Sequence, residues 1–493
     1  MPLGAGVART KTAPGNAPWR GSVIVDEGRR GPTRQVACRA MTERRSSPGA
    51  GDYGRSAALL GSAVGAAGLL TYLFFALASH ALDRDDYGRI VVLWSLMFVA
   101  ISVLFRPIEQ LLSRTIAELE IQKRPTGDAL RIAAQIQLAI GIAFTLVALL
   151  FKGELERRLF DGDELFFWAL VASVLGFGVS FFARGYLAGS GRFGLFAWLL
   201  LVDAIARTLF AFVVAVGIAD GPDPIALGIA IAPGLSAMVF PLAFRARSDA
   251  VPPPATDAHP EFTLAEGSGF AAAILLVMLS EQVFLNSGPL FARAELGAAA
   301  AGFIFNVLMV ARAPVVLFQG AATSLLPHLT RLRSTGGKSS DDAFRQSVRV
   351  TLAAIAGFCA MTTAIVLAAG PTLMEAAFGN KFTYDRAGLA IVAIGMGFFL
   401  AATTLNQAAL AQGQARRASL CWAASAAAML LFYAFPAFDV FRRVEVGFLG
   451  AATLLALLLY LTYRRPKPRN EDTIEAGSPH EVEARLASAE KAI

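Results

Sequence analysis

The amino-acid sequence predicts an all-α, polytopic membrane protein of about twelve transmembrane helices. Hydrophobic residues make up 55% of the 493 residues and charged residues 16%, and the mean hydropathy is +0.55. Soluble domains are about 45–50% apolar and about 25% charged, so this composition indicates a membrane protein. Apolar runs long enough to cross a bilayer core of about 30 Å recur between Ala57 and Tyr463. The runs lack the alternation of barrel strands, which leaves helices to satisfy the backbone in lipid.

The apolar runs fall into two groups of six. A Pro-rich stretch, V-P-P-P-A-T-D-A-H-P, separates the groups and is typical of a linker. Similar motifs, L-A-G-S-G after the fourth run and L-A-Q-G-Q after the tenth, favour a transporter built from two repeats. The predicted crossings are 57–79, 90–112, 130–151, 165–188, 195–217, 224–245, 268–291, 299–326, 347–369, 385–412, 415–438 and 444–463.

These boundaries divide the chain into five segments. Residues 1–54 carry Gly, Pro and Arg without a sustained apolar period, and we expect a disordered cytoplasmic segment there. Met41 precedes the first crossing closely, which leaves open whether residues 1–40 belong to the native protein. The other segments are a six-helix bundle at 55–245, a cytoplasmic linker at 246–267, a second six-helix bundle at 268–463 and a cytoplasmic tail at 464–493.

The distribution of positive charge favours a cytoplasmic location for both termini. Cytoplasmic loops carry an excess of Lys and Arg, and placing the N-terminus inside puts two basic clusters on that side. An even number of crossings returns the C-terminus to the same side. The opposite loops also hold basic residues, so the bias is partial. The residues placed inside are Arg114, Lys123, Arg124, Arg131, Arg331, Arg333, Lys338, Arg345 and Arg349.

Motifs of soluble enzymes occur only as fragments. G-S-G-R-F-G at 189–194 has the glycines of a dinucleotide-binding turn, but it links two crossings rather than a strand and a helix. G-G-K-S at 336–339 lacks the first glycine and the preceding strand of a phosphate-binding loop. The three cysteines and four histidines are not spaced for disulfides or a metal. We therefore expect no enzymatic activity, catalytic residue, cofactor or metal, and the net charge of +7, spread over short loops, indicates no nucleic-acid partner.

Ionisable residues inside the crossings are the main functional signal. Glu281 and Arg312 lie at similar depth near the middle of crossings seven and eight. A charge there costs at least about 2.5–3.5 kcal/mol unless it faces a partner, the bundle interior or a wet cavity. Gln319 and Thr323 follow Arg312 at spacings that keep all three on one helical face. The pattern predicts an ion or substrate pathway.

Polar residues interrupt three further crossings. Asp203 and Arg207 are spaced i,i+4 and can neutralise each other. Arg106 and Glu109 flank Pro107 near a cytoplasmic interface, where long side chains can reach water. The tenth crossing adds Thr403, Asn406 and Gln407. A structural role, as ion pairs and interhelical hydrogen bonds, fits these residues as well as a functional one.

Four stretches of the sequence carry a family resemblance. They are L-D-R-D-D-Y-G-R-I (82–90), F-R-P-I-E-Q-L-L-S-R (105–114), A-R-G-Y-L-A-G-S-G-R-F (183–193) and A-G-F-I-F-N-V-L-M-V-A-R-A-P (301–314). They resemble polysaccharide flippases, the Wzx-type branch of the multidrug/oligosaccharidyl-lipid/polysaccharide (MOP) exporter superfamily. The resemblance covers nearly all of 55–465. It implies two six-helix bundles around a central cavity, and alternating access that moves undecaprenyl-diphosphate-linked oligosaccharide from the inner to the outer leaflet of the bacterial plasma membrane.

The resemblance implies roles for the polar residues. Arginines in such a cavity attract a diphosphate or acidic sugars, and a proton or sodium gradient is expected to drive the cycle. The substrate-binding candidates are Arg312, Arg106, Gln319, Asn406 and Gln407. The ion-coupling candidates are Glu281, Asp203 and Arg207. Expected partners are membrane lipids, the lipid-linked oligosaccharide, and the polymerase and glycosyltransferases of cell-surface polysaccharide or lipopolysaccharide synthesis. The glycan, the coupling ion and the oligomeric state stay open.

Three alternatives compete with this interpretation. A drug antiporter of the same superfamily would prefer carboxylates to arginines in its cavity. A membrane glycosyltransferase or polymerase would need a long external loop, whereas Asp83, Asp85 and Asp86 lie in a short loop and suit helix capping. A major-facilitator transporter would carry G-x-x-x-D-R-x-G-R-R/K, which the loop at 113–131 lacks.

Overall fold

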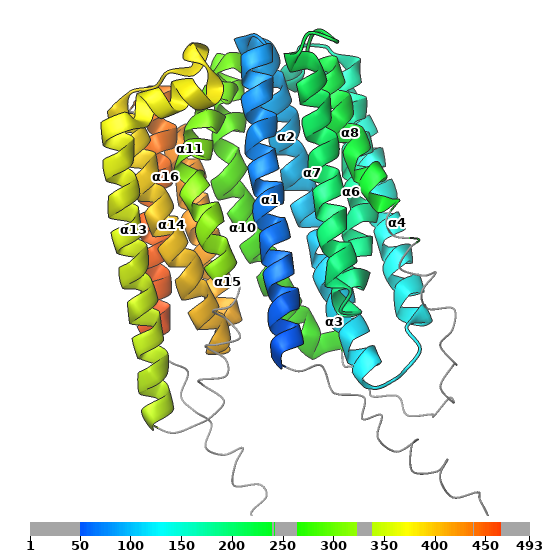
Figure 1. Ribbon diagram of the computed structural model, residues 1–493. Helices are drawn as coiled ribbons and strands as arrows, with labels where there is room; N and C mark the ends of the chain where they lie inside the picture. The colour runs from blue at the N-terminus through cyan, green and yellow to red at the C-terminus, as the bar shows by residue number, and fades with distance from the viewer. Residues whose placement is uncertain (1–49, 239–240, 242–263, 323–337, 437, 465–493) are drawn as a thin grey trace, which may run out of the picture. The chain divides into compact units, whose positions relative to one another are not determined.

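The computed structural model describes residues 50–238, 241, 264–322, 338–436 and 438–464. The described residues form α-helices and one short 3-10 helix (Figure 1). The chain divides into two units, Met1–Tyr53 and Gly54–Ile493, and the second holds almost all of the helices. The α-helices are α1 (Ala50–Ala81), α2 (Arg84–Leu104), α3 (Arg106–Ile121), α4 (Gly127–Leu150), α5 (Lys152–Leu159), α6 (Glu164–Gly189), α7 (Phe193–Ala215), α8 (Asp223–Ala237), α10 (Leu264–Leu296), α11 (Ala298–Ala322), α13 (Lys338–Phe378), α14 (Arg386–Ala411), α15 (Ala415–Ala434) and α16 (Val440–Arg464), with the 3-10 helix η1 at Asn380–Phe382.

The all-α, polytopic membrane fold is confirmed. Ten helices in the described part of the chain are long and apolar enough to cross a membrane, and α2 with α3 counts as one of them. Two shorter apolar stretches, Asp223–Ala237 and Ala298–Arg312, correspond to predicted crossings six and eight. Each predicted crossing therefore overlaps a helix. The proposed linker at 246–267 and the two terminal segments fall mostly outside the described residues.

The second crossing differs from its predicted bounds. It was predicted at 90–112, but the structure has a longer span, Arg84–Ile121, divided at Phe105. Pro107 lies at the start of α3, where its missing N–H leaves no hydrogen bond unmade. The break places Arg106 at a helix start inside the span. The segment after α4, predicted as a loop, contains the short helix α5 with its own surface ion pairs.

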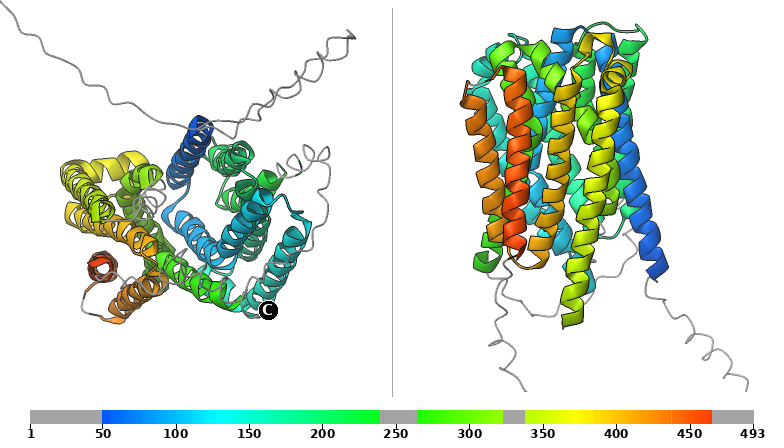
Figure 2. Two further views of the ribbon diagram at one scale, coloured as in Figure 1. Left: turned by 90° about the horizontal axis from the view of Figure 1, so that it is seen from below. Right: turned by 90° about the vertical axis from the view of Figure 1, so that its left-hand side faces the viewer.

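The helices pack as two sets that follow the order of the chain. We call α1–α8 the first half and α10–α16 the second half. Within the first half α6 packs on α3 and α8, and α7 packs on α8; within the second half α14 packs on α13 and α16, and α10 packs on α15 (Figure 2). Helix α2 packs against both α10 and α11, so it forms the main junction of the halves.

Helix α1 also touches both halves. The Thr208 hydroxyl of α7 donates to the carbonyl oxygen of Leu70 at 3.1 Å. The Tyr72 hydroxyl donates to the carbonyl oxygen of Met309 in α11 at 2.9 Å. The Phe75 ring lies 4.5 Å from that of Phe305, centroid to centroid. These contacts join α1 to the second half as well as to the first.

Candidate functional site

A cluster of four polar side chains lies where the halves meet. Arg312 of α11 lies within range of electrostatic interaction with three others, Tyr72, Glu281 and Arg106. These residues come from α1, α3, α10 and α11, two helices from each half. All four side chains are half-buried. We call them the central cluster.

The depth of the central cluster follows from helix geometry. Arg312 lies 14 residues after Ala298, the first residue of α11, which places it about 21 Å along the helix axis at 1.5 Å per residue. Glu281 lies 15 residues before Leu296, the last residue of α10, or about 22 Å from that end. The two charges lie at the same level, as predicted from the sequence. Opposite charges at one level on neighbouring helices lower the cost of holding either of them in a membrane.

A second group of charges extends from the central cluster into the first half. Glu109 of α3 lies within electrostatic range of Arg106 and of Arg184 in α6. Arg184 in turn lies within range of Arg207 in α7. Arg207 forms an ion pair with Asp203 at 3.2 Å, and both side chains are buried. We call Glu109, Arg184, Asp203 and Arg207 the arginine branch.

Aromatic rings hold the guanidinium groups of the arginine branch. Arg207 lies over the Trp94 ring at 4.9 Å, and Arg184 lies over the Phe181 ring at 4.9 Å. Ring faces attract cations, most strongly where water is excluded. The Arg184 Nε and the Asp203 Oδ1 are buried without a hydrogen-bond partner among the described residues. These atoms can therefore accept a further partner without breaking an existing bond.

The charge of the combined region is positive. The central cluster and the arginine branch together hold four arginines against three carboxylates, an excess of one guanidinium. The arginines are Arg106, Arg184, Arg207 and Arg312, and the acids are Glu109, Asp203 and Glu281. A guanidinium offers five donors in a planar fork, which matches a phosphate or carboxylate. The region is thus better suited to an anion than to a cation.

A pocket of about 460 Å³ adjoins this region and includes Arg106 and Glu109. It lies toward the end of the helices where α6 ends and α7 begins. The other lining residues are Gln110, Ser113, Arg114, Ala117, Ala188 and Phe196. All of these residues come from α3, α6 and α7, so the pocket lies within the first half. We call the end of the helices where it lies the open end.

The opposite end of the helices is closed by contacts between the halves. The buried Tyr87 hydroxyl of α2 donates to the Asn306 side-chain oxygen of α11 at 2.5 Å. The Arg293 guanidinium at the end of α10 pairs with Asp161 at 2.7 Å. These bonds join chain positions far apart in the sequence, on opposite sides of the junction. We call this the closed end.

Small residues allow the backbones at the closed end to approach each other. A Cβ added to Gly88 would lie 1.9 Å from the carbonyl oxygen of Ala298. A Cβ added to Gly302 would lie 2.9 Å from the Tyr87 ring. No larger residue fits these positions while α2 and α11 remain this close. The two glycines are therefore tied to the closed arrangement.

The other predicted site residues have different surroundings. Asn406 is buried, and its side-chain oxygen accepts a hydrogen bond from the Trp422 indole at 3.2 Å. Gln407, on the same helix, is half-buried. Gln319 lies in α11, but its side chain is outside the described residues. Asn406 thus bonds to a neighbouring helix of its own half, and contact of Asn406 or Gln407 with a substrate stays a prediction.

Several residues of the site were missed at the level of sequence. Arg184 interrupts the apolar run at 165–188 and was detectable as an intramembrane charge. Tyr72, Tyr87 and Asn306 carry no charge, and nothing in the sequence distinguishes them from packing residues. Among the described residues no group of three or more His, Cys, Asp or Glu side chains could hold a metal ion.

No family model and no curated protein matches the sequence. Solved structures do match. An inward-facing MATE family multidrug resistance transporter of the MOP superfamily aligns at a TM-score of 0.63, with 12% identity over 80% of this chain and 94% of that chain. A MATE transporter of Vibrio cholerae aligns at 0.53, with 16% identity over 83% and 97%. A MOP superfamily transporter from Pyrococcus furiosus, for which reverse polarity of the binding pocket suggests a different function, aligns at 0.56, with 12% identity over 83% and 94%. At these identities the likeness establishes the fold, which is that of MOP superfamily transporters.

Proposed function

We propose that this protein is a flippase that moves undecaprenyl-diphosphate-linked oligosaccharide from the inner to the outer leaflet of the bacterial plasma membrane by alternating access. The observation that carries the proposal is the excess of guanidinium groups where the halves meet. Bidentate arginine contacts suit a diphosphate, and they are strong where water is limited. Arg312 and Arg106 are the first binding candidates. Arg184 is a third, because Glu109 lies within electrostatic range of both Arg106 and Arg184.

The buried contacts between the halves at the closed end support alternating access. The open end is the end predicted to face the cytoplasm, because Arg114, Lys123 and Arg124 lie in or beside its first loop. At the closed end the halves are joined by buried polar contacts. A substrate from the cytoplasmic leaflet would enter at the open end. Its passage outward then requires the closed end to separate.

An ion gradient is the proposed source of energy. Glu281 is the carboxylate of the central cluster, and protonation or sodium binding there would change the charge that Arg312 experiences. Moving one charge through about 100 mV gains about 2.3 kcal/mol, enough to bias a two-state transporter. Both termini are proposed to be cytoplasmic, and the polymerase and glycosyltransferases of the same synthesis are proposed partners. We propose no enzymatic role for the chain.

A cation-exporting drug antiporter is less consistent with the charge of the site. Such a transporter would hold its substrate with carboxylates, whereas here arginines outnumber them. Reverse polarity of the pocket in the Pyrococcus furiosus transporter supports the view that this fold can serve substrates of different charge.

The test is transport by purified full-length protein in proteoliposomes. Undecaprenyl-diphosphate-linked oligosaccharide is placed in both leaflets, and its exposure to an added glycosidase or lectin is followed with and without protein. Arg312→Ala should abolish accelerated exposure while leaving protein abundance intact. Arg157→Ala is the matched control, because its side chain is exposed on α5 and its surface ion pair contributes little. Unchanged activity in Arg312→Ala, or cation export without lipid movement, would contradict the proposal.

A further inference from the structure

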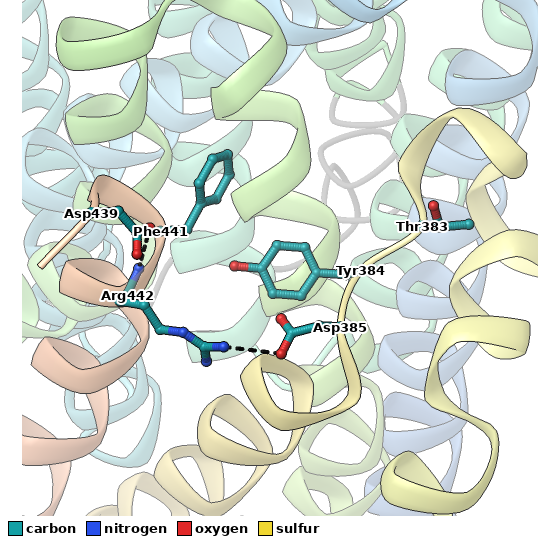
Figure 3. A pocket seen from close by; sticks show the side chains of 6 residues that line it. All are labelled: Thr383, Tyr384, Asp385, Asp439, Phe441 and Arg442. Atoms are coloured by element: carbon teal, nitrogen blue, oxygen red, sulfur yellow. Dashed lines mark hydrogen bonds and ion pairs between the residues drawn. The ribbon is translucent and has the colours of Figure 1, made fainter.

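A second pocket, of about 510 Å³, lies at the closed end within the second half. Figure 3 shows that its side chains come from the segment before α14 and from the start of α16. The lining residues are Thr383, Tyr384, Asp385, Asp439, Phe441 and Arg442. Its volume is within the range of small-molecule sites, about 300–1,000 Å³. It shares no residue with the central cluster or the arginine branch.

Two aromatic rings form the apolar part of this pocket. The centroids of Tyr384 and Phe441 are 6.0 Å apart, with an angle of 59° between the ring planes. The face of an aromatic ring carries partial negative charge. The C–H groups on one side of a pyranose are weakly positive and apolar, so a sugar ring can lie against such a face. The face of either ring, with polar groups beside it, therefore suits a sugar.

The polar groups of the pocket are held in fixed positions. The Arg442 guanidinium donates to Glu445 at 2.7 Å and to Asp385 at 3.0 Å. The Tyr384 hydroxyl donates to the other oxygen of Glu445 at 2.5 Å, and Glu445 is buried beneath the pocket. Groups that are already ordered lose little entropy when a ligand binds. Donors and acceptors at set positions can recognise neighbouring hydroxyl groups of a sugar.

The charge of the pocket limits the kind of sugar. Three carboxyl groups, those of Asp385, Asp439 and Glu445, surround one guanidinium, that of Arg442. A diphosphate or a uronic acid is repelled by this arrangement, whereas a neutral or amino sugar is not. This polarity is opposite to that of the region around Arg312. The two sites are thus suited to different parts of one amphiphilic substrate.

The pocket is next to contacts that hold the halves together. Lys381, in η1, donates to the carbonyl oxygen of Leu82 in the first half at 3.1 Å. The Phe382 ring lies 5.0 Å from the Tyr87 ring. Thr383 and Tyr384 follow directly in the chain. A ligand in the pocket therefore lies beside residues that follow Phe382, which packs on the first half, by one or two positions in the chain.

We propose that this pocket binds a neutral or amino-sugar unit on the external side of the membrane. That the sugar belongs to the transported glycan rests on the proposed function. That the pocket takes a sugar rests on its rings, its ordered polar groups and its charge. Bound there, the sugar occupies the exit of the transport path beside the contacts that close it.

Binding is tested with purified full-length protein in nanodiscs by saturation-transfer difference NMR. The probes are methyl α-glucoside, glucosamine and glucuronic acid. Methyl α-glucoside or glucosamine should bind, and glucuronic acid should bind at least tenfold more weakly. Phe441→Ala should weaken binding at least tenfold, and Phe441→Trp should retain it. Phe438→Ala is the control, since that exposed ring lies outside the pocket.

Asp385 and Asp439 are left unchanged in this test because they also cap the first turns of α14 and α16. Equal binding of glucuronic acid, or equal binding by Phe441→Ala and the unaltered protein, would overturn the proposal. The liposome assay separates the two proposals. Sugar binding that depends on Phe441, without transport of the lipid-linked oligosaccharide, would contradict the proposed function and leave the pocket assignment standing.

Discussion

Replacing Tyr87 by Phe removes one hydroxyl group from the closed end. Tyr87 and Asn306 are both 0% exposed, and the hydroxyl is the donor to the Asn306 side-chain oxygen. Its loss leaves a buried acceptor unsatisfied, at a cost of about 1–3 kcal/mol. The ring, and its packing against Gly302, is kept. The cost applies only while the halves are closed, because water can reach Asn306 once they separate. The equilibrium should therefore move toward the separated state by about 5- to 150-fold.

The shift is measurable as a distance distribution between spin labels on opposite halves. Asp85→Cys and Asn380→Cys, both at exposed positions, carry the labels in a chain without its three natural cysteines. Tyr87→Phe should increase the long-distance population. Adding Asn306→Leu should reverse much of the increase, because removing both partners of a buried hydrogen bond is nearly neutral. Tyr460→Phe, in α16, is the matched control, because it makes the same substitution at another position. If Tyr87→Phe matches that control, or the double variant is as open as the single one, the closed end is not held in this way.

Three further outcomes are expected. Glu281→Gln should transport without responding to an imposed ion gradient in liposomes, and a full response would exclude the coupling role. Asp203→Asn should lower the Tm in detergent, since it leaves Arg207 buried without its counter-charge, a loss of about 3–5 kcal/mol; an unchanged Tm would show that the pair is dispensable. Burial and the Glu445 carboxylate raise the pKa of Tyr384, so the stability that its retained proton provides is complete below the unfolded pKa of about 10 and is lost as the pH rises beyond it. The Tm should therefore fall less steeply above pH 10 in Tyr384→Phe, and parallel curves for the two proteins would contradict this.

The position of the helices along the chain was predictable because the thickness of a bilayer fixes the length of an apolar run. The common depth of Glu281 and Arg312 was predictable for a similar reason. Each residue adds a fixed rise along a helix, so counting from the helix ends gives the level of a side chain. The structure places both residues in one cluster, as expected from those levels.

The direction in which a side chain points could not be obtained by counting residues from the ends of a helix. Asn406 was predicted to bind substrate, and counting along the helix gave no sign that its side-chain oxygen accepts a hydrogen bond from Trp422 of the neighbouring helix. Arg184 was visible as a charge, yet its relation to Glu109 and Arg207 depends on how α3, α6 and α7 are rotated against each other. That rotation results from packing of the whole bundle. Uncharged groups such as Tyr87 and Asn306 give no signal until the fold brings them together.

Helix α1 forms hydrogen bonds to both halves at neighbouring positions. The Leu70 carbonyl is held by α7 and the Tyr72 hydroxyl holds α11, although the two residues are only two positions apart. Under the proposed alternating access the two halves separate. So short a stretch of rigid helix moves with one half and loses its hydrogen bond to the other. Helix α1 would therefore keep only one of these two bonds at a time once the halves separate.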